Sequence, residues 1–474
     1  MGAGFDFVVV GAGTAGCVLA ARLSENPRVS VCLVEAGPDY GPASDRRWPA
    51  DLLDSRFISK SHDWDRLAGS TARRARVVGG SSTENACVAT WGARSDYDEW
   101  APLSFEVLRP SMQRAEHALR CRPIATSGLS PWHAALRSSF ISNGMPDLKD
   151  FNDGDSPTGV GLLVLNASDG VRWNAAFAYL DPARGRSNLT VLGDSVVDRV
   201  SVSKGVARGV VTDTNRVIEG RRIVVSAGAY GSPAVLIRSG IGPASDVKKL
   251  GVVPVADLPV GHGLLDHSGV GLEWQPTRAA IEALGSNAGI ERWPATQIAV
   301  RAASGRCEPN SWDLHIFPLL LTTENQSQVR TLANVYGLRP QSSGSVTLTS
   351  RDPAAAPVIE PCFLTDPTDA EVIIDGIECL REAVESGPAA AFIERELTPG
   401  NLETEEYVKT AIRSFFHPVG TCALGPVVGD RADVNGVPNL YVVDASIMPT
   451  IPRANTNLTT AALAEHFAVR LLDG

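Results

Sequence analysis

Three glycines and one glutamate near the N-terminus have the types and the spacing needed to bind a dinucleotide. Gly11, Gly13 and Gly16 form the pattern G-x-G-x-x-G, and Glu35 follows nineteen residues after the last of them. Glycines permit a tight turn and a close approach of the backbone to a pyrophosphate, which a helix N-terminus then stabilises. A carboxylate at this distance accepts hydrogen bonds from ribose hydroxyls and repels a 2′-phosphate, which favours FAD or NAD over NADP.

A histidine near the other end of the chain is the second residue that could do chemistry. His417 lies in the segment FFHPVGTCALG (415–425), and Asn455, in RANTN, follows 38 residues later. Histidine can act as a general base near neutral pH. A single histidine is more often structural, so the residue type alone assigns no role.

The elements that must position the glycines flank them in the sequence. Residues 5–10 (FDFVVV) are a β-branched, apolar run that is typical of a buried parallel strand. The segment TAGCVLAARL has helical periodicity and ends near Ser24, and a second strand, VSVCLVE, ends at Glu35. This order of strand, turn, helix and strand predicts a nucleotide-binding α/β unit.

Further α/β pieces lie far along the chain. We expect a strand in NLTVLGDSVV (188–197), a strand at 222–226 followed by a helix from about Ser232, and a strand in NLYVVDASIMP that runs into Asp444. A discontinuous nucleotide-binding domain with a second domain inserted in two blocks would join these pieces. The predicted boundaries are 1–100, 186–270 and 416–474 for the nucleotide domain, and 101–185 and 271–415 for the second domain.

The second domain has a different pattern. The alternating runs GSVTLTS (344–350) and SWDLHIFPLLL (311–321) predict antiparallel strands, and DAEVIIDGIECLREAVES (369–386) predicts an amphipathic helix. An antiparallel sheet with helices on one face is a common substrate-binding layer. The expected fold is therefore α/β, with a discontinuous Rossmann-like domain and an α+β substrate domain.

The composition of the 474 residues is that of a globular protein, with 44% hydrophobic and 20% charged residues. A net charge of −10 argues against nucleic acid or an anionic membrane as a partner. The eight cysteines form no C-x-x-C pair, so we expect no metal site and no disulfide framework. The sequence has no signal-peptide pattern and no uncharged apolar run of about 18 residues, which predicts a cytoplasmic protein.

Five groups of motifs, spread over nearly the whole chain, resemble those of the glucose–methanol–choline oxidoreductase family of flavoproteins. One of them, LPVGHGLLDH, departs from the family pattern because a glycine is missing and Gly263 stands where asparagine is usual. The motifs are RARVVGGSSTENACVATWG (74–92), GAYGSPAVLIRSGIG (228–242), LPVGHGLLDH (258–267), the segment 339–373, and HPVGTCALG (417–425) with VVDASIMPTIPRANTNLTTAALAEHFA (442–468).

This resemblance implies FAD rather than NAD. It implies that the loop at Gly79, Gly80 and Asn85 runs along the flavin and the pyrophosphate, and that Val197 contacts the adenine. The residue types in this loop agree with a contact to the flavin, because glycines let backbone N–H groups approach a flat ring edge closely. The cofactor-binding residues expected on this basis are Gly11, Gly13, Thr14, Ala15, Gly16, Glu35, Ala36, Val78, Gly79, Gly80, Ser82, Asn85, Val88, Val197, Ala227, Asp444, Ala445, Asn455 and Thr456.

The resemblance also implies the reaction, which is oxidation of an alcohol to an aldehyde or ketone. A hydride would leave carbon for flavin N5 while a base takes the hydroxyl proton. The family supplies this pair of groups from the motifs that carry His417 and Asn455 here, and other members have histidine at the second position. Because an amide cannot take the proton, we expect His417 to be the base and Asn455 to orient the oxygen. Phe416 and His315 are weaker candidates for the substrate pocket.

Relatives of choline oxidase include enzymes that bond the flavin through a histidine, and the corresponding residue here is Glu84. A carboxylate cannot make that bond, so we expect non-covalent FAD. Another interpretation of Glu84 is a plain polar loop residue.

The partners expected are a small alcohol, of a specialised, biosynthetic kind, and O2 or another electron acceptor. The alternative is a redox-silent member of the family, such as a lyase that uses the same histidine, or a flavin photodecarboxylase. A purely structural flavin protein is disfavoured by the complete His/Asn pair, and a nicotinamide dehydrogenase by the GGSS and DASIMP segments.

Overall fold

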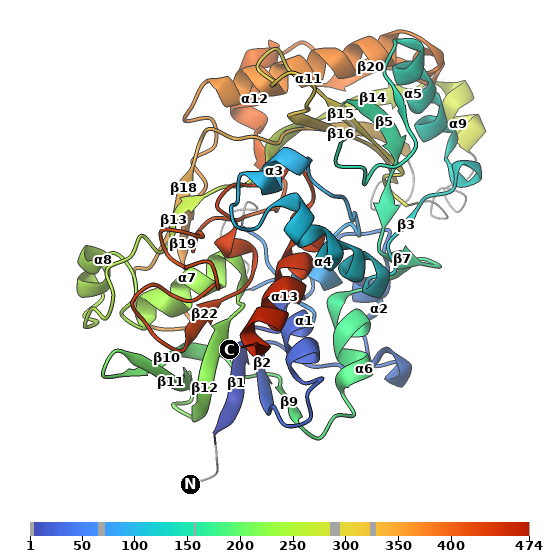
Figure 1. The fold of residues 1–474 in the computed structure, drawn as a ribbon. Coiled ribbons are helices and arrows are strands. Elements are labelled where there is room, and N and C mark those ends of the chain that lie inside the picture. Colours follow the sequence, from blue (N-terminus) through green and yellow to red (C-terminus); the bar gives the residue numbers. More distant parts are fainter. Residues whose placement is uncertain (1–3, 65–71, 156–157, 285–293, 323–328, 474) are drawn as a thin grey trace.

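The computed structural model describes residues 4–64, 72–155, 158–284, 294–322 and 329–473. Two large β-sheets, seen in the lower and upper parts of Figure 1, carry most of the helices. Their arrangement confirms the predicted fold class, with a Rossmann-like α/β part and an α+β part built on a mainly antiparallel sheet. The domain boundaries given above stay a prediction.

The first sheet assembles strands that are distant in the sequence. Its order is β10-β11-β12-β1-β2-β9, with β22 paired to β12. The pairs β12–β1, β1–β2, β2–β9 and β12–β22 are parallel, whereas β10–β11 and β11–β12 are antiparallel. The strands are β1 (Phe5–Val10), β2 (Val31–Val34), β9 (Leu189–Leu192), β10 (Val197–Ser203), β11 (Val206–Thr212), β12 (Val217–Val225) and β22 (Leu440–Val442).

Two sequence predictions about this sheet are wrong in detail. The single strand expected at 188–197 is two strands, β9 and β10, because Asp194 has a left-handed backbone conformation (φ +48°) between them. The backbone N–H of Asp194 donates to the carbonyl of Gly37 instead of continuing a ladder (2.8 Å). The helix expected from about Ser232 begins earlier, at Gly228.

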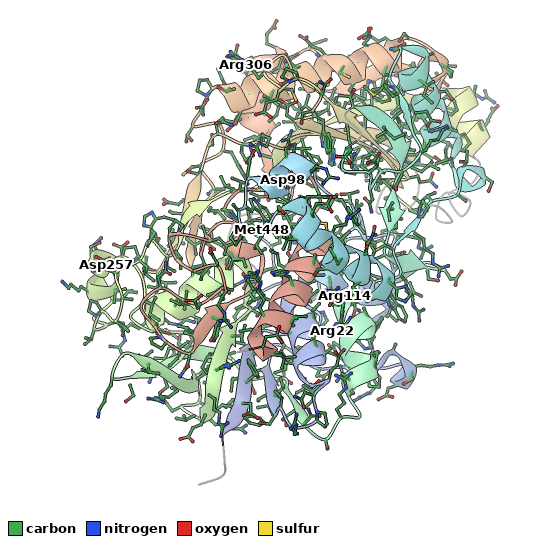
Figure 2. All side chains as sticks on the ribbon, viewed as in Figure 1. Arg22, Asp98, Arg114, Asp257, Arg306 and Met448 are labelled. Carbon is green, nitrogen blue, oxygen red and sulfur yellow. The ribbon has the colours of Figure 1, made fainter. Side chains whose placement is uncertain are left out.

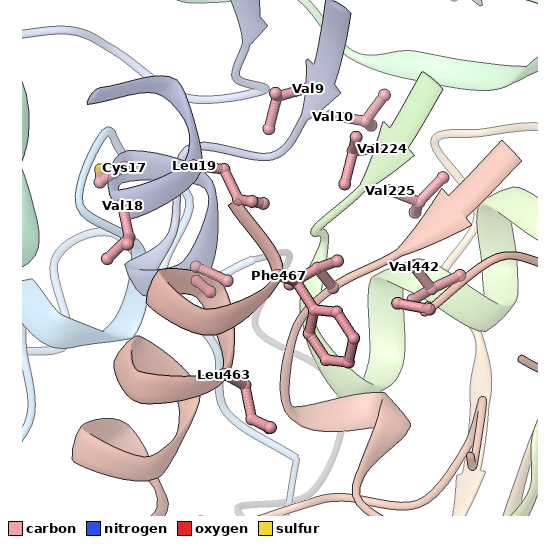
Figure 3. Close-up of a cluster of buried hydrophobic side chains, with 14 of the residues drawn as sticks. Val9, Val10, Cys17, Val18, Leu19, Val224, Val225, Val442, Leu463 and Phe467 are labelled. Carbon is pink, nitrogen blue, oxygen red and sulfur yellow. The ribbon is translucent and has the colours of Figure 1, made fainter. Parts of the chain in front are cut away.

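The core of the first sheet lies between its parallel strands and two helices. The helices are α1 (Thr14–Leu23) and α13 (Thr456–Leu472). Figure 3 shows Val9 and Val225 on the strands and Phe467 and Leu463 on α13, and all four belong to one hydrophobic cluster. Each of these side chains is at least 95% buried, so together they provide the apolar surface that fixes α13 against the sheet.

The buried carboxylate of Glu465 joins helix α13 to α1 and to α4 (Phe105–Ala118) beside this core. Glu465 of α13 is 1% exposed, and it pairs with Arg22 of α1 (2.8 Å) and with Arg114 of α4 (3.2 Å), both labelled in Figure 2. The hydroxyl of Tyr179 is a third partner and donates a hydrogen bond to it (3.0 Å). A buried charge is tolerated only when it is paired in this way, so the position of α13 depends on these contacts.

The second sheet has the order β20-β14-β17-β16-β15-β5-β4, with β21 paired to β14. All pairs are antiparallel except β4–β5. The strands are β4 (Asp147–Leu148), β5 (Gly159–Leu162), β14 (Ser268–Pro276), β15 (Ile298–Ala302), β16 (Leu314–Thr322), β17 (Val329–Gly337), β20 (Ile393–Thr398) and β21 (Arg413–Ser414).

The two faces of the second sheet differ, as alternation along its strands requires. Leu314 and Ile316 of β16 belong to the hydrophobic cluster under helix α11, whereas Phe317 and Leu319 line a cavity. Figure 1 shows helices α11 (Thr368–Glu385) and α12 (Thr404–Ala411) covering the face of the sheet on which this hydrophobic cluster lies. The sheet therefore offers its other face to the site described below.

Among the other helices, α4 packs against α13, and α7 is buried along almost its whole length. No helix of the described ranges is both long and apolar enough to cross a membrane. The other helices are α2 (Ala50–Leu53), α3 (Arg94–Asp98), α4 (Phe105–Ala118), α5 (Pro131–Ser142), α6 (Asp181–Ala183), α7 (Gly228–Arg238), α8 (Ala244–Lys249), α9 (Arg278–Leu284), α11 (Thr368–Glu385) and α12 (Thr404–Ala411). The short strands are β3 (Arg122–Pro123), β6 (Val164–Leu165), β7 (Ala167–Ser168), β8 (Val171–Arg172), β13 (His262–Leu264), β18 (Gly344–Thr347) and β19 (Val358–Glu360).

Candidate active site

A cavity of about 650 Å³ extends from the glycine loop of the first sheet to the open face of the second. Both catalytic candidates, His417 and Asn455, line it, as does Phe416. Most of the predicted cofactor-binding residues line it too, namely Gly11, Gly13, Thr14, Ala15, Glu35, Ala36, Gly80, Asn85, Val88, Val197, Ala227, Asp444, Ala445 and Thr456. Gly16, Val78, Gly79, Ser82 and His315 are not among the lining residues.

The glycine loop has the shape that a pyrophosphate requires. A Cβ at Gly16 would lie 1.8 Å from the carbonyl oxygen of Gly11, so Gly16 is needed for the close packing of helix and strand. A Cβ at Gly13 would have no neighbour nearer than the Cα of Gly80, at 3.9 Å. Gly13 is also the N-cap of α1 and provides no capping side chain. The first N–H groups of α1 therefore point toward open space beside Gly13, which fits a bound phosphate.

Glu35 is held beside this loop by the backbone. Its two oxygens accept hydrogen bonds from the N–H groups of Ala12 (2.7 Å) and Gly37 (2.9 Å). Burial raises the pKa of this carboxyl to about 7. Each oxygen has a further lone pair, so the predicted contact with ribose hydroxyls remains possible in geometry and stays a prediction.

A second glycine turn meets the first one. Gly79 and Gly80 have left-handed backbones (φ +100° and +55°), and a Cβ at Gly80 would lie only 2.6 Å from the Cα of Gly13. Ser82 turns inward, since its hydroxyl donates to the carbonyl of Gly79 (2.6 Å) and accepts from the N–H of Ala175 (3.0 Å). The backbone of this turn, and not the Ser82 side chain, is what faces a cofactor.

Asp444 ties the C-terminal segment to helix α7. One of its oxygens accepts from the hydroxyl of Ser232 (2.5 Å) and from the N–H of Gly228 (2.8 Å), and the other from the N–H of Ser446 (2.8 Å). Burial raises the pKa of this carboxyl. Its role toward a cofactor is thus to fix the wall of the cavity at Ala445.

The two catalytic candidates are in direct contact. Nε2 of His417 lies 3.1 Å from Nδ2 of Asn455, and each side chain is 8% exposed. Asn455 is the N-cap of α13, but its side chain makes no capping bond. Its Oδ1 instead accepts from the hydroxyl of Thr90 (3.2 Å), which leaves Nδ2 turned toward His417. Burial lowers the pKa of His417 to about 3, so the imidazole is neutral at physiological pH.

A carboxylate fixes the turn that carries His417. Asp266 accepts from the backbone N–H of His417 (2.8 Å) and from the hydroxyl of Ser414. That hydroxyl accepts from the N–H of Phe416 (2.7 Å), whose backbone is left-handed (φ +62°), an uncommon conformation for an aromatic residue. These bonds hold the strained turn and set the direction of the His417 side chain.

His267 is the residue that sequence reasoning missed. The sequence favours a structural role for it within LLDH, but its Nδ1 lies 3.0 Å from Nδ1 of His417. The side chain is fully buried, and burial lowers its pKa well below the usual value. The motif was visible in the sequence, but the contact joins residues 150 positions apart and has no local signal.

His315, a weaker pocket candidate, is fully buried and packs against Phe151 and Phe317 rather than against the cavity. Burial lowers its pKa well below the usual value. Phe416, the other candidate, is 43% exposed at the edge of the cavity.

Aromatic side chains surround the base on the side of the second sheet. The rings of Tyr336 and Phe415 are stacked (3.7 Å between centroids, 2° between planes), and the Phe415 ring lies 4.2 Å from that of His417. Phe317 packs against Phe415 at 5.4 Å and is the cross-strand partner of Asn334, which also faces the cavity. The base therefore opens onto a flat apolar wall with an amide beside it.

Glu84 lies in the wall of the same cavity. It is 5% exposed, and its Oε2 lies 4.0 Å from Nη2 of Arg73. Burial raises the pKa of its carboxyl to about 7. Within the described residues no group of three or more histidine, cysteine, aspartate or glutamate side chains is arranged to hold a metal ion.

Such an arrangement can orient a hydroxyl group and remove its proton. A neutral imidazole and an amide N–H converge on one point, beside a phosphate cradle that continues into the same cavity. The residues present thus fit a dinucleotide cofactor that extends from Glu35 toward His417.

Two family models described as GMC oxidoreductase match residues 5–269 and 340–464. The chain is 33% identical to mitochondrial choline dehydrogenase of Homo sapiens, with 98% of this chain and 89% of the relative covered. It is 30% identical to choline oxidase of Arthrobacter globiformis, with 98% and 93% covered. Among solved structures, pyridoxine 4-oxidase from Mesorbium loti matches with a TM-score of 0.88 and 27% identity over 99% of each chain.

Proposed function

The chain belongs to the GMC oxidoreductase family, and on that premise we propose how its residues carry out an FAD-dependent oxidation of an alcohol. FAD, when bound, supplies the acceptor for the hydride that leaves the alcohol carbon. The protein supplies the base, the orientation of the oxygen and a dry cavity. The observation that supports this proposal is the contact between His417 and Asn455 in that cavity.

His417 takes the hydroxyl proton. Its Nε2 faces the cavity beside Asn455. A substrate hydroxyl that approaches both side chains from the cavity would donate to Nε2 in place of the Asn455 contact, and its oxygen would accept an N–H of the amide. As the proton leaves, negative charge grows on that oxygen, and the amide N–H stabilises it. The low exposure of both side chains keeps water away and strengthens these bonds.

The substrate that suits this cavity is a neutral alcohol with a flat, aromatic body. Phe415, Tyr336 and Phe317 form the wall next to the base, and Asn334 offers one polar anchor. Aromatic rings stack on such a wall, whereas a strongly hydrated polyol would lose water without compensation. The two relatives named above carry choline in their names, and the solved structure is that of a pyridoxine oxidase, so a heteroaromatic alcohol occurs in one name and a cationic alcohol in the others. The aromatic preference proposed here is argued from this wall.

The electron acceptor, O2 or another molecule, and the location in the cytoplasm stay predictions. All eight cysteines are free thiols, which supports a reducing compartment. The negative net charge supports the absence of nucleic-acid and membrane partners.

A substrate screen under anaerobic conditions tests the proposal. The FAD-loaded enzyme is mixed with benzylic and heteroaromatic alcohols, choline and glucose, and bleaching of the flavin is followed before oxygen is admitted. Fastest bleaching by an aromatic alcohol is expected, and rapid recovery of the colour in air would identify an oxidase. Faster bleaching by choline or glucose would overturn the aromatic preference. A substrate that is cleaved or decarboxylated while no alcohol bleaches the flavin would favour the lyase or photodecarboxylase alternative.

A further inference from the structure

We propose that His267 is a positioning residue that fixes the tautomer of His417, by accepting the hydrogen bond of the His417 Nδ1–H group. The proposal rests on the function proposed above, because it matters only if Nε2 of His417 must be free to take a proton. The hydrogen-bond donors and acceptors of the connected side chains Thr90, Asn455, His417 and His267 support it.

Thr90 lies at one end of this series of hydrogen bonds. The Thr90 hydroxyl oxygen accepts the backbone N–H of Asn455 (3.3 Å), so its own proton is available to Oδ1 of Asn455 (3.2 Å). Oδ1 is then the acceptor and Nδ2 the donor of this amide. Because Nδ2 can only donate, Nε2 of His417 must accept, and it therefore carries a lone pair and no proton.

A neutral imidazole carries one proton, so that of His417 is on Nδ1. The only polar atom described within hydrogen-bond distance of this Nδ1 is Nδ1 of His267, at 3.0 Å. That atom must accept, which places the proton of His267 on its Nε2. The two rings are nearly perpendicular (83°), and both are shielded from water, so solvent offers no other acceptor.

Loss of the acceptor on His267 would allow the imidazole of His417 to change its tautomer. With no partner at Nδ1, His417 can move its proton to Nε2, where it would face the Nδ2–H group of Asn455 and could take no proton from a substrate. The same logic holds where a carboxylate orients a catalytic histidine, although here a second, neutral histidine does so without adding a charge to the cavity.

Two substitutions separate this role from simple packing. In His267→Asn, Oδ1 occupies nearly the position of the histidine Nδ1 and can accept the same bond, whereas His267→Leu fills space and accepts nothing. Any weaker interaction of the His267 ring with the backbone of Leu338 and Pro452 is lost in both variants alike, so the comparison of the two variants isolates the bond to His417.

We expect His267→Leu to reduce the rate of flavin reduction at saturating alcohol by at least about 10-fold, the scale of one buried hydrogen bond. His267→Asn should restore the rate to within about 3-fold of the parent. FAD content and the melting temperature are measured for both variants. Equal rates in His267→Leu and the parent, or equal losses in both variants, would overturn the proposal.

A measurement on the unmodified holoenzyme decides the case even if His267→Leu does not fold. Nitrogen-15 NMR of the histidine-labelled, FAD-loaded parent distinguishes protonated from unprotonated ring nitrogens, and the signals missing in His417→Gln assign His417. A protonated Nδ1 and an unprotonated Nε2 are expected. The opposite tautomer would overturn the proposal. This readout requires no turnover, so it separates a failure of the tautomer from a failure to find an oxidised alcohol.

Discussion

Nε2 of His417 and Nδ2 of Asn455 lie 3.1 Å apart although 38 residues separate them in the chain. His417 sits on a turn held by Asp266, and Asn455 sits at the start of α13. Because independent elements deliver the two groups, each can be removed without moving the other far. This separation allows their contributions to be measured one at a time.

Replacement of the base is the first test. His417→Ala should reduce the rate of flavin reduction by an alcohol by about 10²–10⁴, the usual contribution of a positioned general base. FAD should remain bound, because the glycine loop and Glu35 lie elsewhere. Stopped-flow absorbance of the flavin measures the rate. A variant that is reduced as fast as the parent would show that His417 is structural.

Replacement of the amide should cost less. Asn455→Ala removes a hydrogen bond to the oxygen but leaves the base, whereas Asn455→Asp should be worse than Asn455→Ala because a carboxylate repels the developing negative charge. The two residues share one substrate oxygen, so the effects of His417→Ala and Asn455→Ala should not add in the double mutant. Additive losses would indicate that they act on separate steps.

Local patterns were sufficient to predict much of the fold. Strand β1 and helix α1 lie where the apolar run and the glycines place them, because their side chains repeat with the periods of strand and helix. The break between β9 and β10 at Asp194 was not predicted, since no local sequence pattern indicates a left-handed backbone conformation at that aspartate. That conformation is set by a hydrogen bond to Gly37, on another segment.

The site was predictable only in part, for the same reason. The motifs placed His417 and Asn455 in one cavity, but the support of each depends on contacts across the chain. Neither the bond from Thr90 to Asn455 nor the contact of His267 with His417 follows from spacing in the sequence. His315 shares a face of β16 with Phe317, as alternation predicts, but it packs beside Phe151 and is not among the residues that line the cavity, a packing contact that has no local signal in the sequence.

Gly13 should be essential for the cofactor and dispensable for the fold. A Cβ there has no neighbour nearer than 3.9 Å, and it points toward the cavity, so Gly13→Val should leave the melting temperature of the apoprotein nearly unchanged. Its side chain would occupy the space of the pyrophosphate, and purified protein should contain little or no flavin. Gly128→Val, at a position with nothing within 4 Å, is the matched control and should stay yellow. A fully yellow Gly13→Val would mean that the cradle lies elsewhere.

FAD should be released when the protein is denatured. The resemblance to relatives of choline oxidase predicts that Glu84 stands where some of them carry a linking histidine, and a carboxyl cannot form that histidyl bond. After acid precipitation, flavin fluorescence should therefore appear in the supernatant. Fluorescence that stays with the washed pellet would demonstrate a covalent link and would contradict the proposal for Glu84.

Acid should weaken the folded state through His417, the residue proposed as the base. Burial lowers the pKa of His417 to about 3 in the folded protein, against about 6.5 for an unperturbed histidine. Between about pH 3 and pH 6.5 the unfolded chain binds a proton at this histidine and the folded chain does not. The free energy of unfolding is therefore unaffected by this group above about pH 6.5 and decreases as the pH falls from there toward about 3. The catalytic rate responds differently, because it depends only on the folded state.

The base is competent when it is neutral, so the rate of flavin reduction should rise with pH only through the depressed pKa of about 3. Between pH 8 and pH 5 we expect less than about a twofold change from this group, whereas an exposed histidine would lose most of its activity below pH 6.5. Asp266, whose pKa burial raises to about 7, touches the His417 backbone and could titrate in this window. The profile is therefore recorded for the parent and for Asp266→Asn by stopped flow. A midpoint near 6.5 that persists in Asp266→Asn would assign an ordinary pKa to His417, and it would show that the base is exposed to water during the reaction.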